Sequence, residues 1–327
     1  MTRISDVAKH AGVSVATVSR VLVGQGSVSE ATRERVLASV KALDYHPDLA
    51  ARRLRSGKTD TLGLIVSDIR NPYFTEVSRA IEDVAYARGM RVLLCNADED
   101  PAKERFYLDM MRDENVAGVI LSPTLSLLNQ YRAEDFSFPL VLVDRCDAKT
   151  EADAVVLDNI DAAQRLTRHL LERNCRRIAF FYGAASATGS QRLAGYQAAL
   201  AEAGLSAITQ PVKPTTDDAR QALSTYLERH RQTPDAVVAS SGLILLGLVE
   251  GLRQHGLRYP QDVIVAGFDD MPWTRIVTPD ITVMAQPTAD IGRTAIELLL
   301  ARIAQPGQAM RRIVMRGELI VRGSSAA

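Results

Sequence analysis

Apolar residues at the start of the chain recur at the spacing of one face of a helix. This spacing predicts a first helix over residues 4–11, which ends at Gly12 because glycine adopts a left-handed conformation at little cost. Ser14 can then cap a second helix, and Ser29 a third. The inward positions of these two helices are apolar: Val18, Val21, Leu22, Val36, Val40 and Leu43. Two helices joined by a short turn with glycine predict a helix-turn-helix, and the third helix completes a small core.

Beyond residue 59 the pattern changes to short apolar runs that alternate with amphipathic segments of helical length, which is typical of parallel α/β units. The apolar runs predict buried strands at residues 62–66, 91–95, 118–121, 139–143, 178–182, 236–239 and 263–268. Helices are predicted between them, at residues 74–88, 161–173 and 288–304 among others. The order of these elements predicts two successive α/β lobes, with a ligand at the carboxyl ends of their strands.

The charge of the chain is unevenly distributed. Residues 1–58 contain ten Lys and Arg against five Asp and Glu, whereas the remainder contains 29 against 34. A basic head on an acidic body favours a polyanionic partner for the head alone.

The cysteines and the apolar runs narrow the class of protein further. Cys95, Cys146 and Cys175 are odd in number and show no C-x-x-C spacing, so we expect no disulfide framework, no metal site and no cofactor. The N-terminal residues do not form the apolar segment of an export signal, and no apolar run approaches the length of a membrane span. We therefore expect a cytoplasmic protein with no membrane partner.

The residues of the head are more specific than their spacing. Three segments carry a resemblance: residues 4–22 (ISDVAKHAGVSVATVSRVL), 28–33 (VSEATR) and 45–47 (YHP). They resemble the head of the LacI/GalR family of bacterial transcription regulators, without gaps through residue 58. The resemblance implies sequence-specific binding to double-stranded operator DNA at the bacterial nucleoid, with repression as the expected outcome.

A recognition helix places its N-terminal residues against base edges in the major groove. Arg20 can donate to guanine O6 and N7, whereas Val15 and Ala16 can offer apolar contacts, for example to thymine methyl groups. Contacts to phosphate, which fix the register of the helix on DNA, are predicted for Ser14, Thr17 and Ser19. Val23 stands where the family often has Asn, so we expect one phosphate contact to be missing.

Residues 48–55 (DLAARRLR) resemble the hinge helix of the family, which becomes ordered on operator DNA and lies in the minor groove. Leu54 matches the apolar residue that the family inserts between base steps to kink the DNA. Ala50 and Arg52 are predicted to contact DNA beside it. The alternative is a basic linker in which this leucine is incidental.

The body resembles the same family at its predicted strand ends. The matching segments are residues 66–74 (VSDIRNPYF), 142–145 (LVDR), 192–196 (RLAGY) and 265–270 (VAGFDD). The resemblance implies that a cleft between the lobes is lined by Asp68, Ile69, Phe74, Asp144, Arg145, Arg192, Asp269 and Gln286. We add Ser122, which ends the third strand, and Ser241, which stands where the family usually has an amide, and we expect Arg192 to begin a helix.

The chemistry of these side chains suits a polyol, because carboxylates accept hydrogen bonds from hydroxyls, arginines donate them and an aromatic ring covers the apolar side of a sugar. Two arginines also leave room for a carboxylate on the ligand. The predicted effector is thus a small polar metabolite, either a sugar or a sugar acid. Trp273 follows Asp269 closely and either reports on the cleft or serves in packing.

Two other classes of protein fit a two-lobed α/β body. An enzyme is disfavoured because the chain has no G-x-G-x-x-G after its first strand, no complete P-loop, no H-E-x-x-H and no G-x-S-x-G. A transport-type binding protein is disfavoured by the basic head and by the lack of an export signal.

The predicted fold is a three-helix helix-turn-helix head and a hinge helix, joined to a two-lobed periplasmic-binding-protein-like α/β body with parallel sheets. The predicted boundaries are 1–46 for the head, 47–58 for the hinge, about 59–160 and 288–316 for the first lobe, and about 161–287 and 317–327 for the second. We expect a homodimer on a near-palindromic operator, whose hinges respond when the effector changes the angle between the lobes. A higher oligomer, and an effector that acts as inducer or as corepressor, remain alternatives.

Overall fold

The computed structural model describes residues 2–23, 28–45, 59–147, 149–230 and 232–326. It divides into two compact units, Met1–Thr59 and Asp60–Ala327. In the described part of the chain, no helix is both long enough and apolar enough to span a bilayer.

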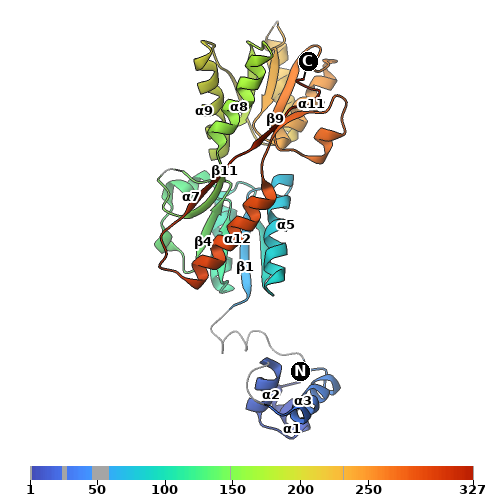
Figure 1. Cartoon of the computed structure of the whole chain (residues 1–327), viewed down its shortest axis with the longest axis vertical. Coiled ribbons are helices and arrows are strands. Elements are labelled where there is room, and N and C mark those ends of the chain that lie inside the picture. Colours follow the sequence, from blue (N-terminus) through green and yellow to red (C-terminus); the bar gives the residue numbers. More distant parts are fainter. Residues whose placement is uncertain (1, 24–27, 46–58, 148, 231, 327) are drawn as a thin grey trace. The chain divides into compact units, whose positions relative to one another are not determined.

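The N-terminal unit contains the predicted helices α1 (Ile4–Ala11), α2 (Val15–Val23) and α3 (Glu30–Ala42), drawn in blue in Figure 1. Gly12 ends α1 with a φ of 67°, a left-handed conformation that glycine adopts readily. The core of this unit is formed by Val7, Ala8, Ala11, Val18, Val21 and Val36. His10 Nδ1 and Ser39 Oγ are 3.0 Å apart and join α1 to α3.

The second unit contains two six-stranded sheets with the same order of strands (Figure 1). The first has the order β11-β5-β4-β3-β1-β2 and is parallel throughout. Its strands are β1 (Thr61–Val66), β2 (Arg91–Asn96), β3 (Gly118–Leu121), β4 (Leu140–Val143), β5 (Asp153–Leu157) and β11 (Arg312–Met315). Its helices are α5 (Pro72–Ala87), α6 (Pro101–Asp113), α7 (Leu125–Gln130) and α12 (Thr288–Ala304), with a short 3-10 turn at Ala133–Asp135.

The second sheet has the order β12-β10-β9-β8-β6-β7, and only β12 runs antiparallel to its neighbour. Its strands are β6 (Ile178–Gly183), β7 (Ile208–Val212), β8 (Ala236–Ala239), β9 (Ile264–Phe268), β10 (Thr282–Ala285) and β12 (Glu318–Ile320). Its helices are α8 (Asn159–Glu172), α9 (Ala187–Glu202), α10 (Thr216–Arg229) and α11 (Gly242–Gln254), with a 3-10 helix at Pro272–Arg275.

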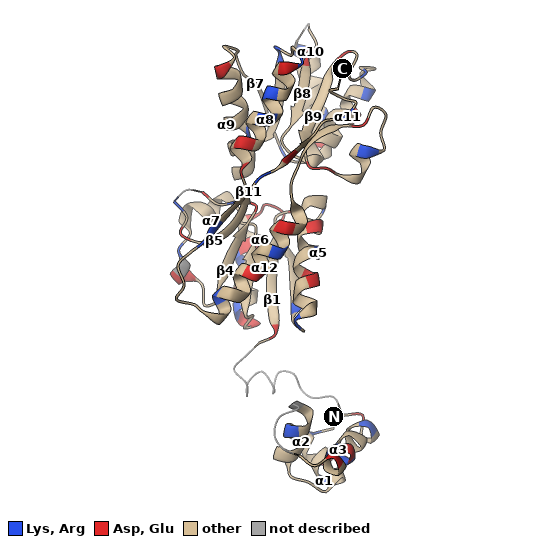
Figure 2. Ribbon diagram, in the orientation of Figure 1, with Lys and Arg blue, Asp and Glu red and all other residues tan. Residues whose placement is uncertain are grey.

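Helices cover both faces of each sheet, which explains why the central strands are apolar on both sides. In the first lobe α5 and α12 pack on one face and α6 and α7 on the other. In the second lobe α8 and α9 pack on one face and α10 and α11 on the other. Figure 2 shows the consequence, with most charged residues on helices and loops and few on the strands of the sheets.

The predicted two-lobed α/β fold is confirmed, but the sequence pattern missed the edge strands β7, β11 and β12 and the inner strands β5 and β10. Their residues are partly exposed in β7, β11 and β12, so they lack a continuous apolar run. One local prediction was wrong. Arg192 does not begin a helix, because α9 begins at Ala187 and Arg192 lies inside it.

The chain passes between the lobes after β5, after β10 and after β11, so that each lobe contains segments that are distant in sequence. Arg165 Nη1 of α8 donates to the Gly317 carbonyl at the last of these crossings, at 2.7 Å. The C-terminal segment then ends inside the second lobe, where Ser324 and Ser325 are fully buried. The carboxyl ends of both sheets therefore lie next to the segments that connect the lobes.

Candidate functional site

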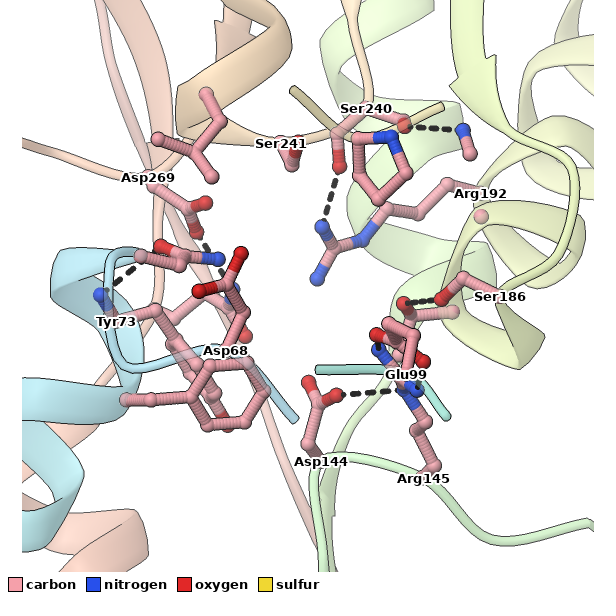
Figure 3. A pocket seen from close by; sticks show the side chains of 18 residues that line it. Asp68, Tyr73, Glu99, Asp144, Arg145, Ser186, Arg192, Ser240, Ser241 and Asp269 are labelled. Atoms are coloured by element: carbon pink, nitrogen blue, oxygen red, sulfur yellow. Dashed lines mark hydrogen bonds and ion pairs between the residues drawn. The ribbon is translucent and has the colours of Figure 1, made fainter. Parts of the chain in front are cut away.

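A pocket is lined by residues that follow the strands of both sheets (Figure 3). It brings together eight of the residues that the sequence suggested: Asp68, Phe74, Asp144, Arg145, Arg192, Ser241, Asp269 and Gln286. Two others lie outside its lining. Ile69 packs on the core of the first lobe, and Ser122 is buried with its Oγ 2.8 Å from Ser67 Oγ.

Trp273 is also absent from the lining. Its ring packs on the core of the second lobe, and its Nε1 donates to Met271 Sδ at 3.2 Å. Of the two roles considered for this tryptophan, the structure shows the packing role.

Asp144 and Asp269 occupy equivalent places in the two lobes. Asp144 follows β4 and Asp269 follows β9, and these strands have the same position in their sheets. Both residues have a left-handed backbone, with φ of 70° and 75°, a conformation that Asp tolerates better than most side chains. This turn directs each carboxylate into the pocket (Figure 3).

The Arg145 guanidinium is occupied by carboxylates of its own lobe. Its Nε donates to Asp144 Oδ2 at 3.0 Å, and its Nη1 and Nη2 donate to the two carboxylate oxygens of Glu99, the former at 2.6 Å. Nη1 also lies 3.4 Å from the Pro123 carbonyl oxygen. Although Arg145 is only 5% exposed and burial alone would lower its pKa, these two carboxylates raise the pKa above its ordinary value.

Arg192 has a different environment. It is 3% exposed, its Nε donates to Asn159 Oδ1 at 2.8 Å, and its Nη1 donates to the Ser240 carbonyl at 2.5 Å. Its guanidinium carbon lies 4.0 Å from the centre of the Phe268 ring, a cation-π contact. No ion pair joins it to a carboxylate within the described residues, and burial lowers its pKa despite the attraction of Asp269 and Asp144.

Asp269 is held by neutral donors. Its Oδ2 accepts from the Gly242 backbone N–H at 2.8 Å, at the start of α11, and its Oδ1 accepts from Gln286 Nε2 at 2.6 Å. A Cβ at position 242 would lie 2.3 Å from Met271 Cε, so a larger residue there would have to displace the Met271 side chain. The glycine at this position thus allows α11 to begin against the carboxylate.

Three buried polar atoms of the pocket have no partner in the described structure. They are Tyr73 Oη, Ser241 Oγ and Gln286 Oε1. Buried polar atoms of native proteins are nearly always hydrogen-bonded, so three unpartnered atoms in one pocket indicate a place for a polar ligand.

The sequence pattern did not indicate several of the residues that line the pocket. They include Tyr73, Glu99, Ser186, Thr188 and Ser240. Glu99 was detectable in principle, since Asp98, Glu99 and Asp100 form an acidic run directly after a predicted strand. No group of acidic, His or Cys side chains suited to a metal ion occurs among the residues with assigned positions.

In the N-terminal unit, the first turns of α2 present Val15, Ala16 and Arg20 to solvent, and Val15 is 37% exposed. Ser14 caps this helix, since its Oγ accepts from the Thr17 backbone N–H at 3.2 Å. The hydroxyls of Ser14 and Thr17 are 2.9 Å apart on the same exposed edge. The predicted hinge contacts Ala50, Arg52 and Leu54 lie outside the described residues.

Comparison with known families gives two matches along the chain. Residues 3–48 match the model of bacterial regulatory proteins of the lacI family, and residues 167–325 match a periplasmic binding protein-like domain. The chain is 37% identical to the ribose operon repressor of Halalkalibacterium halodurans, an alignment that covers 98% of this chain and 96% of the relative.

Solved structures give the same result. A transcriptional regulator CelR in complex with cellobiose shares 31% identity and a TM-score of 0.74, with 99% of this chain and 100% of that chain covered. A lac repressor dimer bound to operator and an anti-inducer has a TM-score of 0.90 at 23% identity, covering 100% of this chain and 99% of that one. The latter likeness concerns the fold.

Proposed function

Because this chain belongs to the LacI family of bacterial regulatory proteins, we propose that the pocket binds the effector that controls the affinity of the protein for operator DNA. Like its relatives, the protein is an effector-controlled, DNA-binding transcriptional repressor, and it is not an enzyme. The effector is a sugar or a sugar acid, a class consistent with relatives named for ribose and cellobiose.

The main support for the proposed site is that the pocket contains buried polar groups without partners among the described residues. Within the described residues Arg192 is a buried cation without a carboxylate partner, and Tyr73, Ser241 and Gln286, each with one unpartnered buried atom, line the same pocket. A sugar offers several hydroxyls, each able to donate and accept, and so can satisfy all of these groups together. Asp68, Phe74, Asp144 and Asp269 complete the proposed effector site, whereas Ile69 and Ser122 support it from outside the lining.

The same residues connect the effector to the segments between the lobes. Asn159, which holds Arg192, follows the first crossing, and Gln286, which holds Asp269, follows the second. A ligand that forms hydrogen bonds with Arg192 and Asp269 would therefore affect two of the connections between the lobes. We propose that this changes the angle between them and, through the hinge at residues 47–58, the affinity for operator.

For the DNA side we propose the division drawn from the sequence, with residues 1–46 as the DNA-binding domain and 59–327 as the effector and dimerisation domain. Val15, Ala16 and Arg20 read base edges, Ser14, Thr17 and Ser19 bind phosphates, and Ala50, Arg52 and Leu54 enter the minor groove. Since operator DNA is the partner, the protein acts at the nucleoid in the bacterial cytoplasm.

We propose a homodimer on a near-palindromic operator. One feature that favours association is the edge of the first sheet, where β2 has no further strand among the described residues. Leu94 on this strand is 45% exposed, and Tyr86 on the contacting helix α5 is 78% exposed. Exposed apolar side chains beside an open strand edge are typical of surfaces that another chain covers. Light scattering of the full chain gives the oligomeric state directly.

The proposed function is tested by operator binding. A gel-shift assay at physiological salt compares DNA from the region beside the protein's own gene with scrambled duplex, with and without sugars and sugar acids. The proposal expects a preference for the former that a metabolite changes. A ligand that weakens binding is an inducer and one that strengthens it is a corepressor. No preference under any of these conditions would contradict the proposal.

Arg20 provides the sharper test of base reading. Arg20→Ala is expected to cost about 1–3 kcal/mol on the preferred operator and much less on scrambled DNA, because a bidentate contact to guanine is lost. Arg35→Ala, which removes an exposed cation from α3 instead, is the matched control. Equal losses on both DNAs for Arg20→Ala would exclude base reading by this side chain.

A further inference from the structure

The pocket contains more carboxylates than free cations. Its acidic lining residues are Asp68, Glu99, Asp144 and Asp269, and its basic ones are Arg145 and Arg192. A ligand carboxylate would meet these like charges in a buried site, where their repulsion is weakly screened. It can enter only if a guanidinium is free to bind it. The availability of the two arginines therefore decides the charge of the effector.

Arg145 is not available to a ligand. Glu99 binds both of its terminal nitrogens in the paired geometry that a ligand carboxylate would need, and Asp144 takes Nε (Figure 3). The Glu99 backbone has a left-handed φ of 58°. Its N–H donates to the Ser67 carbonyl at 3.2 Å, and this hydrogen bond fixes the position of the residue. The protein thus supplies the carboxylate that would otherwise come from a sugar acid.

Arg192 is available only in part. Its Nε and Nη1 already donate to Asn159 and to the Ser240 carbonyl, which leaves Nη2 without an acceptor in the described part of the chain. Among the described residues, the other buried atoms of the pocket that have no partner are uncharged: the hydroxyls of Tyr73 and Ser241 and the amide oxygen of Gln286. The amide oxygen can only accept, so it requires a donor such as a hydroxyl, which neutral sugars and sugar acids both carry, and none of these three atoms offers a cation to a ligand carboxylate.

We propose that Glu99 is a specificity-determining residue, which restricts the effector to an uncharged, polyhydroxylated sugar by withholding Arg145 from the ligand. Arg192 Nη2 then donates to a sugar hydroxyl, while Asp144, Asp269 and the Gln286 amide oxygen accept from others. This inference rests on the proposed function, in that the pocket is taken as the effector site. It resolves the choice between sugar and sugar acid that the two arginines leave open in the sequence.

The test compares matched pairs of sugars and sugar acids on the full-length protein. The probes are D-ribose, D-glucose, D-galactose and cellobiose, each beside its aldonate, with melting temperature and titration calorimetry as readouts. D-glucuronate and D-galacturonate are included because they keep the pyranose ring, and so separate the effect of charge from that of ring opening in the aldonates. We expect a neutral sugar to raise the melting temperature of the wild type and its aldonate to bind at least about tenfold more weakly, because buried like charges repel. Glu99→Gln is expected to narrow that ratio by about tenfold, since it removes one carboxylate and frees Arg145.

Asp98→Asn is the matched control, because it removes the same charge from the same loop but outside the pocket, where Asp98 pairs with Lys103. Its ratio of sugar to aldonate binding should equal that of the wild type. The inference is overturned if an aldonate binds the wild type as tightly as its sugar, if Glu99→Gln changes both members of a pair equally, or if none of the four sugars binds. The wild-type comparison stands even if a variant does not fold, and operator binding tests the proposed function separately.

Discussion

The two lobes share one sheet order, and each places an aspartate with a left-handed backbone at the same point, Asp144 after β4 and Asp269 after β9. The groups around these two carboxylates are nevertheless different. In the first lobe the neighbouring Arg145 is bound by Glu99 and Asp144. In the second lobe Asp269 is held by neutral donors. The nearby cation Arg192 comes from a helix, and its acceptors among the residues that the structure describes are neutral.

This difference shows that two aspartates at equivalent positions of similar folds can have different electrostatic surroundings. The charge of Arg145 is compensated by the protein, so that region forms a fixed wall of the pocket. No carboxylate pairs with Arg192 in the described part of the chain, and its neutral acceptors and the Phe268 ring compensate its buried charge less fully than carboxylates would. On the proposal that this pocket is the effector site, we expect the first region to contribute to stability and selectivity and the second to respond to the ligand.

Arg145→Met should give the largest effect, on stability. It leaves Glu99 and Asp144 as two adjacent carboxylates in a largely buried site, and breaking such a pair typically costs about 3–5 kcal/mol in the free energy of unfolding. Urea denaturation without ligand measures this cost. The double variant with Glu99→Gln should recover a substantial part of it, because one of the uncompensated charges is then absent. A cost below about 1 kcal/mol would mean that the first region does not depend on its ion pairs.

Arg192→Met should show the reverse pattern. The loss of hydrogen bonds to Asn159 and Ser240 is offset in part by the removal of an unpaired buried charge, so we expect a stability change of only about 1–2 kcal/mol without ligand. Binding of the sugar that stabilises the wild type most should fall by about 2–3 kcal/mol, since a charged donor is lost. Calorimetry gives the affinity, and a gel shift shows whether the operator response is lost. If sugar still releases or recruits the variant as it does the wild type, Arg192 is not part of the effector site.

The comparison also shows what the sequence could predict. Asp144, Arg145 and Asp269 directly follow apolar runs, and the carboxyl ends of parallel strands meet at one edge, so their place in the pocket followed from the pattern. The central strands and the helices of the head were predictable for the same reason, since their apolar positions are buried. The side strands β7, β11 and β12 were not, because short and partly exposed strands carry little pattern.

The partners of the charged residues could not be predicted. Glu99 is 46 positions from Arg145 and reaches it because two successive residues, Asp98 and Glu99, take left-handed conformations. Asn159 is 33 positions from Arg192 and lies on a different helix. Both pairings depend on how helices and loops pack in three dimensions. The sequence could therefore propose two arginines for the ligand, but it could not show that one of them is already bound.

The smallest effect is expected from a variant that makes the second region resemble the first. Asn159→Asp places a carboxylate against Arg192 Nε, at a site where the asparagine oxygen now lies 2.8 Å away. The new ion pair should raise the free energy of unfolding by up to about 1 kcal/mol, an estimate reduced by the loss of the amide donor to Gln191 Oε1 and the Leu157 carbonyl. The variant should weaken sugar binding by a similar amount, because Arg192 would already have a carboxylate partner within the protein. Asn174→Asp makes the same exchange at an exposed turn after α8 and should change neither quantity. If Asn159→Asp instead bound the sugar more tightly than the wild type, the lack of a carboxylate partner would not be what prepares Arg192 for the ligand, and the contrast between the two regions would have to be explained by shape alone.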